Sequence, residues 1–337
     1  MTTKRTKPAD TKLLICVWHS FTFWRPQPVM PETIQRRWPE MRVVHLPDYE
    51  RLPEELPDTD IFVGYSLRPQ QLVHARKLKW IHSTAAGVAQ LMYPELRDSG
   101  IMVTNPSGIF SPPMAEHIMG VMLALARNLP DSVRYQDQSC WGQQALWDKP
   151  QSLTELSGKV LLIVGYGSIG RELAKRAQAF DMRVWGVTRS GKGDASHTEK
   201  ILPAAQLDEA VPQADYVVLA APETPETKQL VDAARMAKMK RGARLINVAR
   251  GSLLDETALL HALEQGRLAG AMLDVTGTEP LPADSPLWKA PNLLITPHTS
   301  AISDRLWIRQ TDVLMDLLER WFDGRELFNV VDFAKGY

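Results

Sequence analysis

A short apolar strand that runs directly into a glycine-rich turn constrains the fold of this chain more than any other feature. The run Lys159-Val-Leu-Leu-Ile-Val164 ends in Gly165-Tyr-Gly-Ser-Ile-Gly170, and the next ten residues continue with helical apolar spacing. Strand, glycine turn and helix in this order are typical of a dinucleotide-binding unit, because tight turning, close backbone approach and helix packing each require a missing side chain. A purely structural glycine turn is the alternative.

The helix N-terminus beyond this turn offers free N–H groups and a positive dipole end to a pyrophosphate. We therefore expect a nicotinamide dinucleotide to be bound by Gly165, Gly167, Ser168, Ile169 and Gly170.

Short strand candidates alternate with segments long enough to hold helices along the whole chain. They lie at 13–18, 42–46, 61–64, 80–83 and 102–104, then near Val160 and at 183–187, 216–220, 244–248, 270–273 and 293–296. This alternation predicts the α/β class, with two Rossmann-like or flavodoxin-like doubly wound parallel-sheet domains and a cleft between them. A final helix is expected at 302–322.

Three candidate strands are each followed by a residue suited to acid–base or anion chemistry. Arg250 follows the strand at 244–248, Glu279 follows 270–273, and His298 follows 293–296. Strand exits of a parallel sheet open at its carboxyl edge, where such folds bind ligands. An arginine there can clamp a carboxylate, and a glutamate beside a histidine can orient the imidazole and favour its protonated form. A helix-terminal arginine, a solvated loop acid and an ordinary surface histidine are the alternatives.

These motifs, together with Val103-Thr-Asn-Pro-Ser-Gly108, Ala115-Glu-His117 and Ala220-Ala-Pro-Glu-Thr-Pro-Glu-Thr227, resemble the D-isomer-specific 2-hydroxyacid dehydrogenase family. The resemblance covers most of the chain from about Trp80 onward and is of the glyoxylate/hydroxypyruvate reductase type. It implies that Arg250, Glu279 and His298 are catalytic and that Asp274, otherwise a strand-end cap, holds the nicotinamide ring. It also implies a discontinuous substrate domain, 1–108 plus 302–337, and a dinucleotide-binding domain, 109–301.

Further contacts follow from the same resemblance and from the loops after the strands. The loop Ser83-Thr-Ala-Ala-Gly87 ends a strand with small residues, so its N–H groups can form an anion nest for a carboxylate; an ordinary turn is the alternative. Substrate contacts are thus expected at Ala86, Gly87 and Val88, together with Arg250 and His298. Additional cofactor contacts are expected at Ala221, Pro222, Thr227, Val248, Ala249, Asp274 and Ser300.

The end of the second strand of the dinucleotide unit predicts NADP(H) rather than NAD(H). NAD sites usually carry an acid about 20 residues beyond the glycines, but here the sequence reads Thr188-Arg189-Ser190. Asp181 precedes the strand and would lie at the wrong edge. Arg189 suits a 2′-phosphate, with Thr188 and Ser190 as hydroxyl donors; a solvent-facing arginine is the alternative.

The expected reaction is reduction of a small 2-oxo acid, such as glyoxylate or hydroxypyruvate, to the D-2-hydroxy acid. No second arginine is obviously placed to bind a distant charge, and Trp18, Trp24 and Trp141 either wall off a small pocket or pack a domain. Rival interpretations are a phosphite, formate or phosphoglycerate oxidoreductase on the same scaffold, or a non-catalytic dinucleotide sensor of the co-repressor type. Glu279 speaks against the formate enzymes, which resemble this family but carry an amide there.

Composition excludes several other classes. Among the 337 residues, Lys plus Arg and Asp plus Glu number 39 each, so nothing indicates nucleic-acid binding. Apolar runs are well short of the roughly 20 residues of a membrane span, and the polar start lacks a secretory signal. Cys16 and Cys140 give neither a disulfide framework nor a metal-ligand spacing. We expect a cytoplasmic protein without a metal.

A long, largely apolar helix is expected at 114–128, after the helix start Ser111-Pro-Pro113. A helix that is apolar nearly all round must be buried or paired with another chain. We therefore expect a homodimer with this helix in its interface; a helix wedged between the two domains is the alternative.

Overall fold

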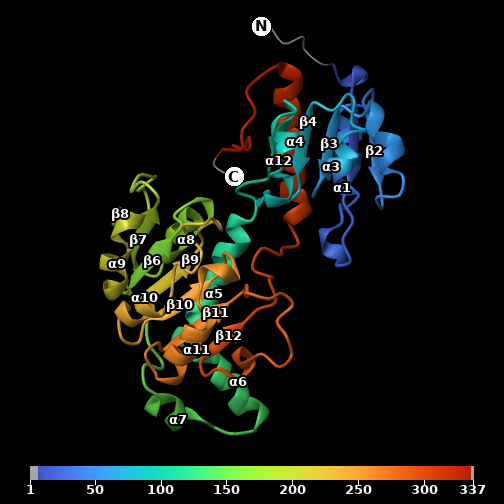
Figure 1. The fold of residues 1–337 in the computed structure, drawn as a ribbon. Helices are drawn as coiled ribbons and strands as arrows, with labels where there is room; N and C mark the ends of the chain where they lie inside the picture. Colours follow the sequence, from blue (N-terminus) through green and yellow to red (C-terminus); the bar gives the residue numbers. More distant parts are fainter. Residues whose placement is uncertain (1–6, 335–337) are drawn as a thin grey trace. The chain divides into compact units, whose positions relative to one another are not determined.

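The computed structural model describes residues 7–334, and the chain divides into two compact units (Figure 1). Unit 1 comprises Met1–Ile109 and Ser303–Tyr337, and unit 2 comprises Phe110–Ile302. Both are parallel α/β units, so the predicted fold class of two doubly wound parallel-sheet domains is confirmed.

In the described part of unit 1, five strands form one sheet in the order β2-β1-β3-β4-β5. All neighbouring strands are parallel. The central strands are buried along their whole length, as expected when helices cover both faces of a sheet. The strands are β1 (Lys12–Cys16), β2 (Arg42–Leu46), β3 (Ile61–Gly64), β4 (Trp80–Ser83) and β5 (Met102–Thr104).

Each face of this sheet carries its own hydrophobic core. On one face, Leu13 and Ile15 of β1 pack against α1 (Val29–Arg37) and α12 (Leu306–Asp323). The opposite core includes residues of the short helices α2 (Leu52–Glu55), α3 (Pro69–Leu72) and α4 (Pro94–Arg97). Figure 1 shows the C-terminal α12, in red, beside the blue and cyan N-terminal strands.

The described part of unit 2 contains a seven-stranded parallel sheet in the order β12-β11-β10-β9-β6-β7-β8. Its strands are β6 (Val160–Val164), β7 (Arg183–Thr188), β8 (Lys200–Pro203), β9 (Tyr216–Leu219), β10 (Arg244–Asn247), β11 (Gly270–Leu273) and β12 (Leu293–Ile295). The strand β8 was missing from the sequence prediction. It is a half-buried edge strand that pairs only with β7 among the described residues, so it lacks the apolar signal of a central strand.

Helices cover both faces of this sheet too. One core joins β6 to α5 (Ser111–Ala126) and α8 (Ser168–Gln178). The other joins β6 and β9 to α9 (Leu207–Ala210), α10 (Ala233–Lys238) and α11 (Glu256–Glu264). Among the helices of the described residues, none combines the length and apolar character needed to cross a membrane.

The long apolar helix forms as expected, with its end earlier than predicted. α5 ends at Ala126, and Asn128 takes a left-handed conformation that leads into α6 (Leu129–Asp137) and α7 (Gln143–Asp148). Many apolar side chains of α5, including Met114, Ile118 and Met122, are buried in the core of unit 2 itself. The excess of apolar surface inferred for this helix from sequence is therefore largely absorbed within one chain.

Candidate active site

The predicted trio lies behind three neighbouring strands. Arg250, Glu279 and His298 follow β10, β11 and β12, which are adjacent and parallel in the sheet. Their loops therefore leave the same carboxyl edge of unit 2, which is where open α/β sheets bind ligands.

His298 and Glu279 are in direct contact. The imidazole Nδ1 lies 2.7 Å from Glu279 Oε2, and both side chains remain partly open to solvent, at 48% and 38%. An ionised carboxylate can only accept, so Nδ1 carries the proton of this bond and Nε2 is left for another partner. The other carboxylate oxygen, Oε1, accepts from the N–H of Thr276 at 3.1 Å, which fixes the orientation of Glu279.

The backbone of His298 adopts a left-handed conformation, with φ of 54°. Non-glycine residues rarely take this conformation, and it persists where surrounding structure enforces it. Here the N–H of His298 donates to the carbonyl of Asp274 at 2.9 Å. The imidazole is thus presented by a constrained turn.

Asp274 organises the whole loop that carries His298. Its carboxylate, which is buried, accepts from Thr296 Oγ1 at 2.5 Å and from the N–H groups of Thr299 and Ser300 at 2.9 and 3.1 Å. His117 of α5 adds a 3.3 Å contact from Nε2 to Thr296 Oγ1, and burial lowers the pKa of this histidine. Asp274 is therefore a strand-end anchor in this structure, and its predicted contact with nicotinamide stays a prediction.

Arg250 lies on a turn that the buried Asn247 holds in place. Asn247 Nδ2 donates to the carbonyl of Arg250 at 2.9 Å, and its Oδ1 accepts from the N–H of Ala249 at 3.0 Å. A Cβ on Gly251 would lie 2.1 Å from the backbone of Thr276, so this glycine lets the loops carrying Arg250 and Glu279 approach closely. The guanidinium is exposed, and no carboxylate within residues 7–334 forms an ion pair with it.

Asn247 and Thr276 are functional supports that the sequence analysis did not single out. Asn247 is the last residue of β10 and Thr276 lies in the loop after β11, and polar residues at such places usually cap or turn the chain. The position of Asn247 three residues before Arg250 was the one signal available.

The glycine turn has the geometry expected for a dinucleotide. Gly165 has φ of 93°, and a Cβ there would lie 2.3 Å from the backbone nitrogen of Ala221. A Cβ on Gly170 would lie 3.1 Å from Ile163, as close helix–strand packing requires. A Cβ on Gly167 would meet nothing within 4 Å, and the side chain at the N-cap of α8 is absent. The N-terminus of α8 is therefore open to an anion.

Other predicted cofactor residues surround this turn or take part in loop structure. Ala221 and Pro222 follow β9, next to β6, and the contact with Gly165 places Ala221 at the glycine turn. Thr227 Oγ1 donates to the carbonyl of Pro222 at 2.7 Å and so closes this loop. Val248 and Ala249 are buried at the exit of β10, beside Arg250, and Ser300 is buried in the His298 loop.

The end of β7 carries Thr188, followed by the exposed Arg189 and Ser190. Thr188 Oγ1 donates to the carbonyl of Lys192 at 3.0 Å. The pKa of Glu226 is lowered, first by a hydrogen bond from Thr224 and in small part by the charge of Arg189, which places Arg189 near the loop after β9. Asp181 lies in the turn before β7, at the opposite edge.

The predicted substrate residues Ala86, Gly87 and Val88 lie in unit 1, after β4. Gly87 is exposed, whereas Val88 is buried. No residue within 7–334 accepts a hydrogen bond from their backbone N–H groups, which agrees with an anion nest.

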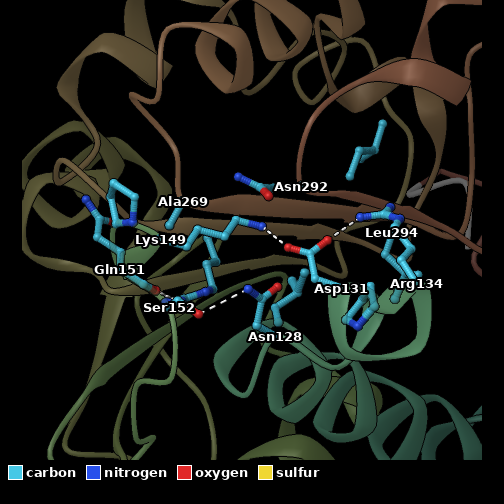
Figure 2. A pocket seen from close by; sticks show the side chains of 14 residues that line it. Asn128, Asp131, Arg134, Lys149, Gln151, Ser152, Ala269, Asn292 and Leu294 are labelled. Carbon is cyan, nitrogen blue, oxygen red and sulfur yellow. Dashed lines mark hydrogen bonds and ion pairs between the residues drawn. The ribbon is translucent and has the colours of Figure 1, made fainter. Parts of the chain in front are cut away.

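A separate pocket opens at the opposite edge of the unit 2 sheet, at the amino ends of β10, β11 and β12. Figure 2 shows Asp131 between Lys149 and Arg134, and both cations form ion pairs with it. Arg244, the first residue of β10, donates to the carbonyl of Gln151 at 2.8 Å. The pocket lies at the other end of the strands from Arg250, Glu279 and His298. We therefore interpret its charged residues as structural ion pairs and not as catalytic groups.

Comparison with known proteins gives one family. The family described as D-isomer specific 2-hydroxyacid dehydrogenase, NAD binding domain, matches residues 119–300. Glyoxylate reductase of Pyrococcus furiosus is 34% identical over 268 residues, covering 77% of this chain and 78% of that protein. D-3-phosphoglycerate dehydrogenase of Methanocaldococcus jannaschii is 32% identical over 286 residues; the match covers 84% of this chain but 53% of that protein, so the chain spans about half of it.

A solved structure extends the likeness to both units. The crystal structure of an NADPH-dependent glyoxylate/hydroxypyruvate reductase from Sinorhizobium meliloti, in complex with NADP and sulfate, superposes with a TM-score of 0.80 at 26% identity, covering 97% of this chain and 100% of that one. With its two parallel α/β units, its glycine turn and these relatives, the chain belongs to the D-isomer specific 2-hydroxyacid dehydrogenase family of oxidoreductases.

Proposed function

We propose that this protein reduces a small 2-oxo acid of the glyoxylate or hydroxypyruvate type to the D-2-hydroxy acid, with NADPH preferred over NADH. The observation that carries the proposal is the 2.7 Å contact between His298 and Glu279, at the sheet edge where Arg250 also emerges. A proton donor held by an acid, together with a cation free of an acidic partner among the described residues, suits the reduction of a carbonyl beside a carboxylate.

His298 acts as the general acid. Its Nδ1 is engaged by Glu279, so Nε2 carries the proton that passes to the carbonyl oxygen, and the charge of Glu279 stabilises the imidazolium before transfer. In the reverse direction the neutral Nε2 accepts the proton of the hydroxyl group. Arg250 binds the substrate carboxylate and polarises the carbonyl, so it stabilises the negative charge that develops on the oxygen.

Substrate recognition rests on backbone groups and one cation. The N–H groups of Ala86, Gly87 and Val88, which lack acceptors within residues 7–334, bind the substrate carboxylate. In this proposal unit 1 is the substrate domain and unit 2 the dinucleotide-binding domain.

The residues of the glycine turn fit a nicotinamide dinucleotide. The open space at Gly167 admits a close backbone approach, and the uncapped N-terminus of α8 offers N–H groups to the pyrophosphate. When bound, the reduced cofactor supplies the hydride that reaches the carbonyl carbon. Contacts from Ser168, Ile169, Thr227, Val248, Ala249, Asp274 and Ser300 belong to the same proposal.

The NADPH preference rests on Arg189. We expect Arg189→Ala to weaken NADPH by roughly tenfold and to leave NADH almost unchanged, because one charge-assisted hydrogen bond to the 2′-phosphate is lost. The measurement is the ratio of kcat/KM for the two cofactors on one substrate. Arg183→Ala is the matched control, since Arg183 is an exposed arginine at the other end of β7, paired with Glu199. An unchanged ratio in Arg189→Ala would remove the basis for the preference.

The reaction itself is tested by following the absorbance of reduced nicotinamide with a panel of 2-oxo acids and each cofactor in turn. We expect turnover of glyoxylate or hydroxypyruvate. No turnover with any 2-oxo acid would contradict the proposal and would favour the non-catalytic dinucleotide sensor. Turnover confined to a phosphorylated substrate would instead favour a phosphoglycerate enzyme.

The protein is also proposed to act as a homodimer in the cytoplasm. Its two cysteines, Cys16 and Cys140, are free thiols, as expected in a reducing compartment. We place the interface at α6 and α7, which contain no buried residues. Trp141, between them, is 90% exposed, and Trp147 of α7 is exposed as well. Exposed aromatic side chains are typical of an interface.

A further inference from the structure

In the loop after β4, side chains bind the carbonyl oxygens and leave several backbone N–H groups without a partner among the described residues. The backbone N–H groups of Ala86, Gly87 and Val88 have no acceptor within residues 7–334. The carbonyl oxygens of residues 84–87 each accept from a side-chain donor: Thr84 from Gln310 Nε2 at 2.6 Å, Ala85 from Ser83 Oγ at 3.0 Å, Ala86 from Asn105 Nδ2 at 2.9 Å, and Gly87 from Gln90 Nε2 at 3.3 Å.

This asymmetry has a direct electrostatic consequence. Carbonyl oxygens near an anion repel it, whereas N–H groups attract it. Because the amide groups of Gln310 and Asn105 draw the carbonyls of Thr84 and Ala86 toward the protein interior, the N–H groups of the loop are left for a negatively charged ligand.

The two anchoring amides come from distant parts of the chain and are themselves buried. Gln310 lies on α12 and is 1% exposed, and Asn105 follows β5 and is 7% exposed. Asn105 is fixed further, because its Oδ1 accepts from the N–H of Ser107 at 3.1 Å and its own N–H donates to the carbonyl of Asn329 at 3.1 Å.

Only one of the two polar atoms of the Gln310 side chain is paired among the described residues. Its Oε1 is buried and has no hydrogen-bond partner among the described residues, and an unsatisfied buried acceptor is unfavourable. An apolar residue of the same length would avoid this cost. The hydrogen bond to Thr84 is thus the one interaction that a glutamine provides here.

We propose that Gln310 and Asn105 are positioning residues, which turn the carbonyls of the 84–87 loop inward and so create the carboxylate-binding face of the substrate site. The inference rests on the proposed function, because it takes the ligand of this loop to be the carboxylate of the 2-oxo acid. Neither side chain contacts the reacting atoms in this account; both act through the loop.

The test compares Gln310→Met, which keeps the length of the side chain and removes the donor, with Asn105→Asp, which keeps the acceptor for Ser107 and removes the donor to Ala86. Each variant is expected to raise KM for the 2-oxo acid by about five- to tenfold, with kcat within about twofold of wild type. Oxalate, a dicarboxylate that cannot be reduced, should lose inhibitory strength in parallel. The dissociation constant of NADPH should not change, because its contacts lie in unit 2.

Thr311→Val is the matched control. Thr311 is buried on the same helix, and its Oγ1 donates to the carbonyl of Trp307 at 2.7 Å without touching the loop. This variant should lower Tm and leave KM unchanged, whereas Gln310→Met should keep Tm at or above the wild-type value. If Gln310→Met does not fold, Asn105→Asp carries the same comparison.

Wild-type turnover is measured first, so that the two proposals can fail separately. Absence of turnover with every 2-oxo acid would overturn the proposed function itself. Wild-type KM and oxalate inhibition in folded Gln310→Met and Asn105→Asp proteins would overturn the positioning role and leave the proposed function standing.

Discussion

His298 is held in a left-handed backbone conformation that is uncommon for residues other than glycine, although asparagine, aspartate and histidine adopt it more often than the rest. The free energy needed to keep it there comes from its surroundings: Asp274 accepts hydrogen bonds from the loop on both sides of the histidine, and Glu279 binds the imidazole. A histidine fixed at both backbone and ring loses little freedom when it donates a proton. Preorganisation of this kind lowers the barrier of a proton transfer.

A second histidine, His82, has the opposite environment. It is fully buried on β4, and burial lowers its pKa from 6.5 to about 3. Trp80 Nε1 donates to Thr104 Oγ1, and the same hydroxyl group lies 2.9 Å from His82 Nδ1. This ring is therefore neutral in the folded protein throughout the physiological range.

The pH dependence of stability follows from this shift. Below pH 6.5 the unfolded chain takes up a proton at His82 that the folded protein does not bind, so stability decreases as pH falls from 6.5 toward about 3. His82→Asn should remove about 2 kcal/mol of the stability difference between pH 7.5 and pH 5, measured by urea unfolding. The exposed His74, changed to Asn, is the control. Equal pH dependence in wild type and His82→Asn would refute the assignment.

At the scale of elements, the turn between β6 and α8 contains one glycine that the fold requires and another that is proposed to serve cofactor binding. Gly165 and Gly167 stand two residues apart, but a side chain at the first would collide with the backbone of Ala221, and one at the second would meet nothing. The same mutation at the two positions therefore has different physical effects.

Gly167→Ala should keep the Tm of the wild type and weaken NADPH by more than about tenfold, because its methyl group occupies the space where the pyrophosphate approaches the backbone. Gly165→Ala should lower Tm markedly, since it adds both a backbone collision and an unfavourable positive φ. Thermal unfolding and NADPH fluorescence titration measure the two effects. Full NADPH affinity in Gly167→Ala would show that the open space serves another purpose.

Much of this element structure could be predicted from the sequence, because buried parallel strands are continuous apolar runs. The predicted strands at 244–248 and 270–273 placed Arg250 and Glu279 at one edge, and in the structure β10 and β11 are adjacent and parallel. The half-buried β8 lacked such a run. Gln310 could not be recognised because it is one polar residue in an amphipathic helix, and its partner Thr84 lies 226 positions away. Contacts of this kind depend on tertiary packing, which local patterns do not encode.

At the scale of the whole molecule, the two units divide the proposed work. Unit 2 carries Arg250, Glu279, His298 and the glycine turn, and unit 1 carries the loop after β4 that is proposed to bind the carboxylate. Because α12 belongs to unit 1 and follows the His298 loop closely in sequence, the chain passes from His298 to Gln310 within one short segment. Gln310, which is proposed to position the loop after β4, thus lies close in sequence to His298, the proposed proton donor.

The proposed homodimer is a prediction at this scale. Sedimentation velocity at micromolar concentration should give a dimer, and Trp141→Glu combined with Trp147→Glu should give a monomer, because charged residues then replace the exposed aromatic surface. Val73→Glu, at an exposed apolar position in unit 1, should remain dimeric. A monomeric wild type would exclude the homodimer. A dimer that survives the double substitution would show that the interface lies elsewhere.

His298 is the proposed proton donor in the reduction of a 2-oxo acid. The most direct test is steady-state turnover of His298→Ala with glyoxylate or hydroxypyruvate and NADPH, alongside a fluorescence titration of NADPH binding. We expect a loss of about 10²- to 10⁴-fold in kcat with an unchanged dissociation constant for NADPH, whose proposed contacts at the glycine turn lie on β6 and α8. A folded His298→Ala protein with kcat close to the wild-type value would contradict this role.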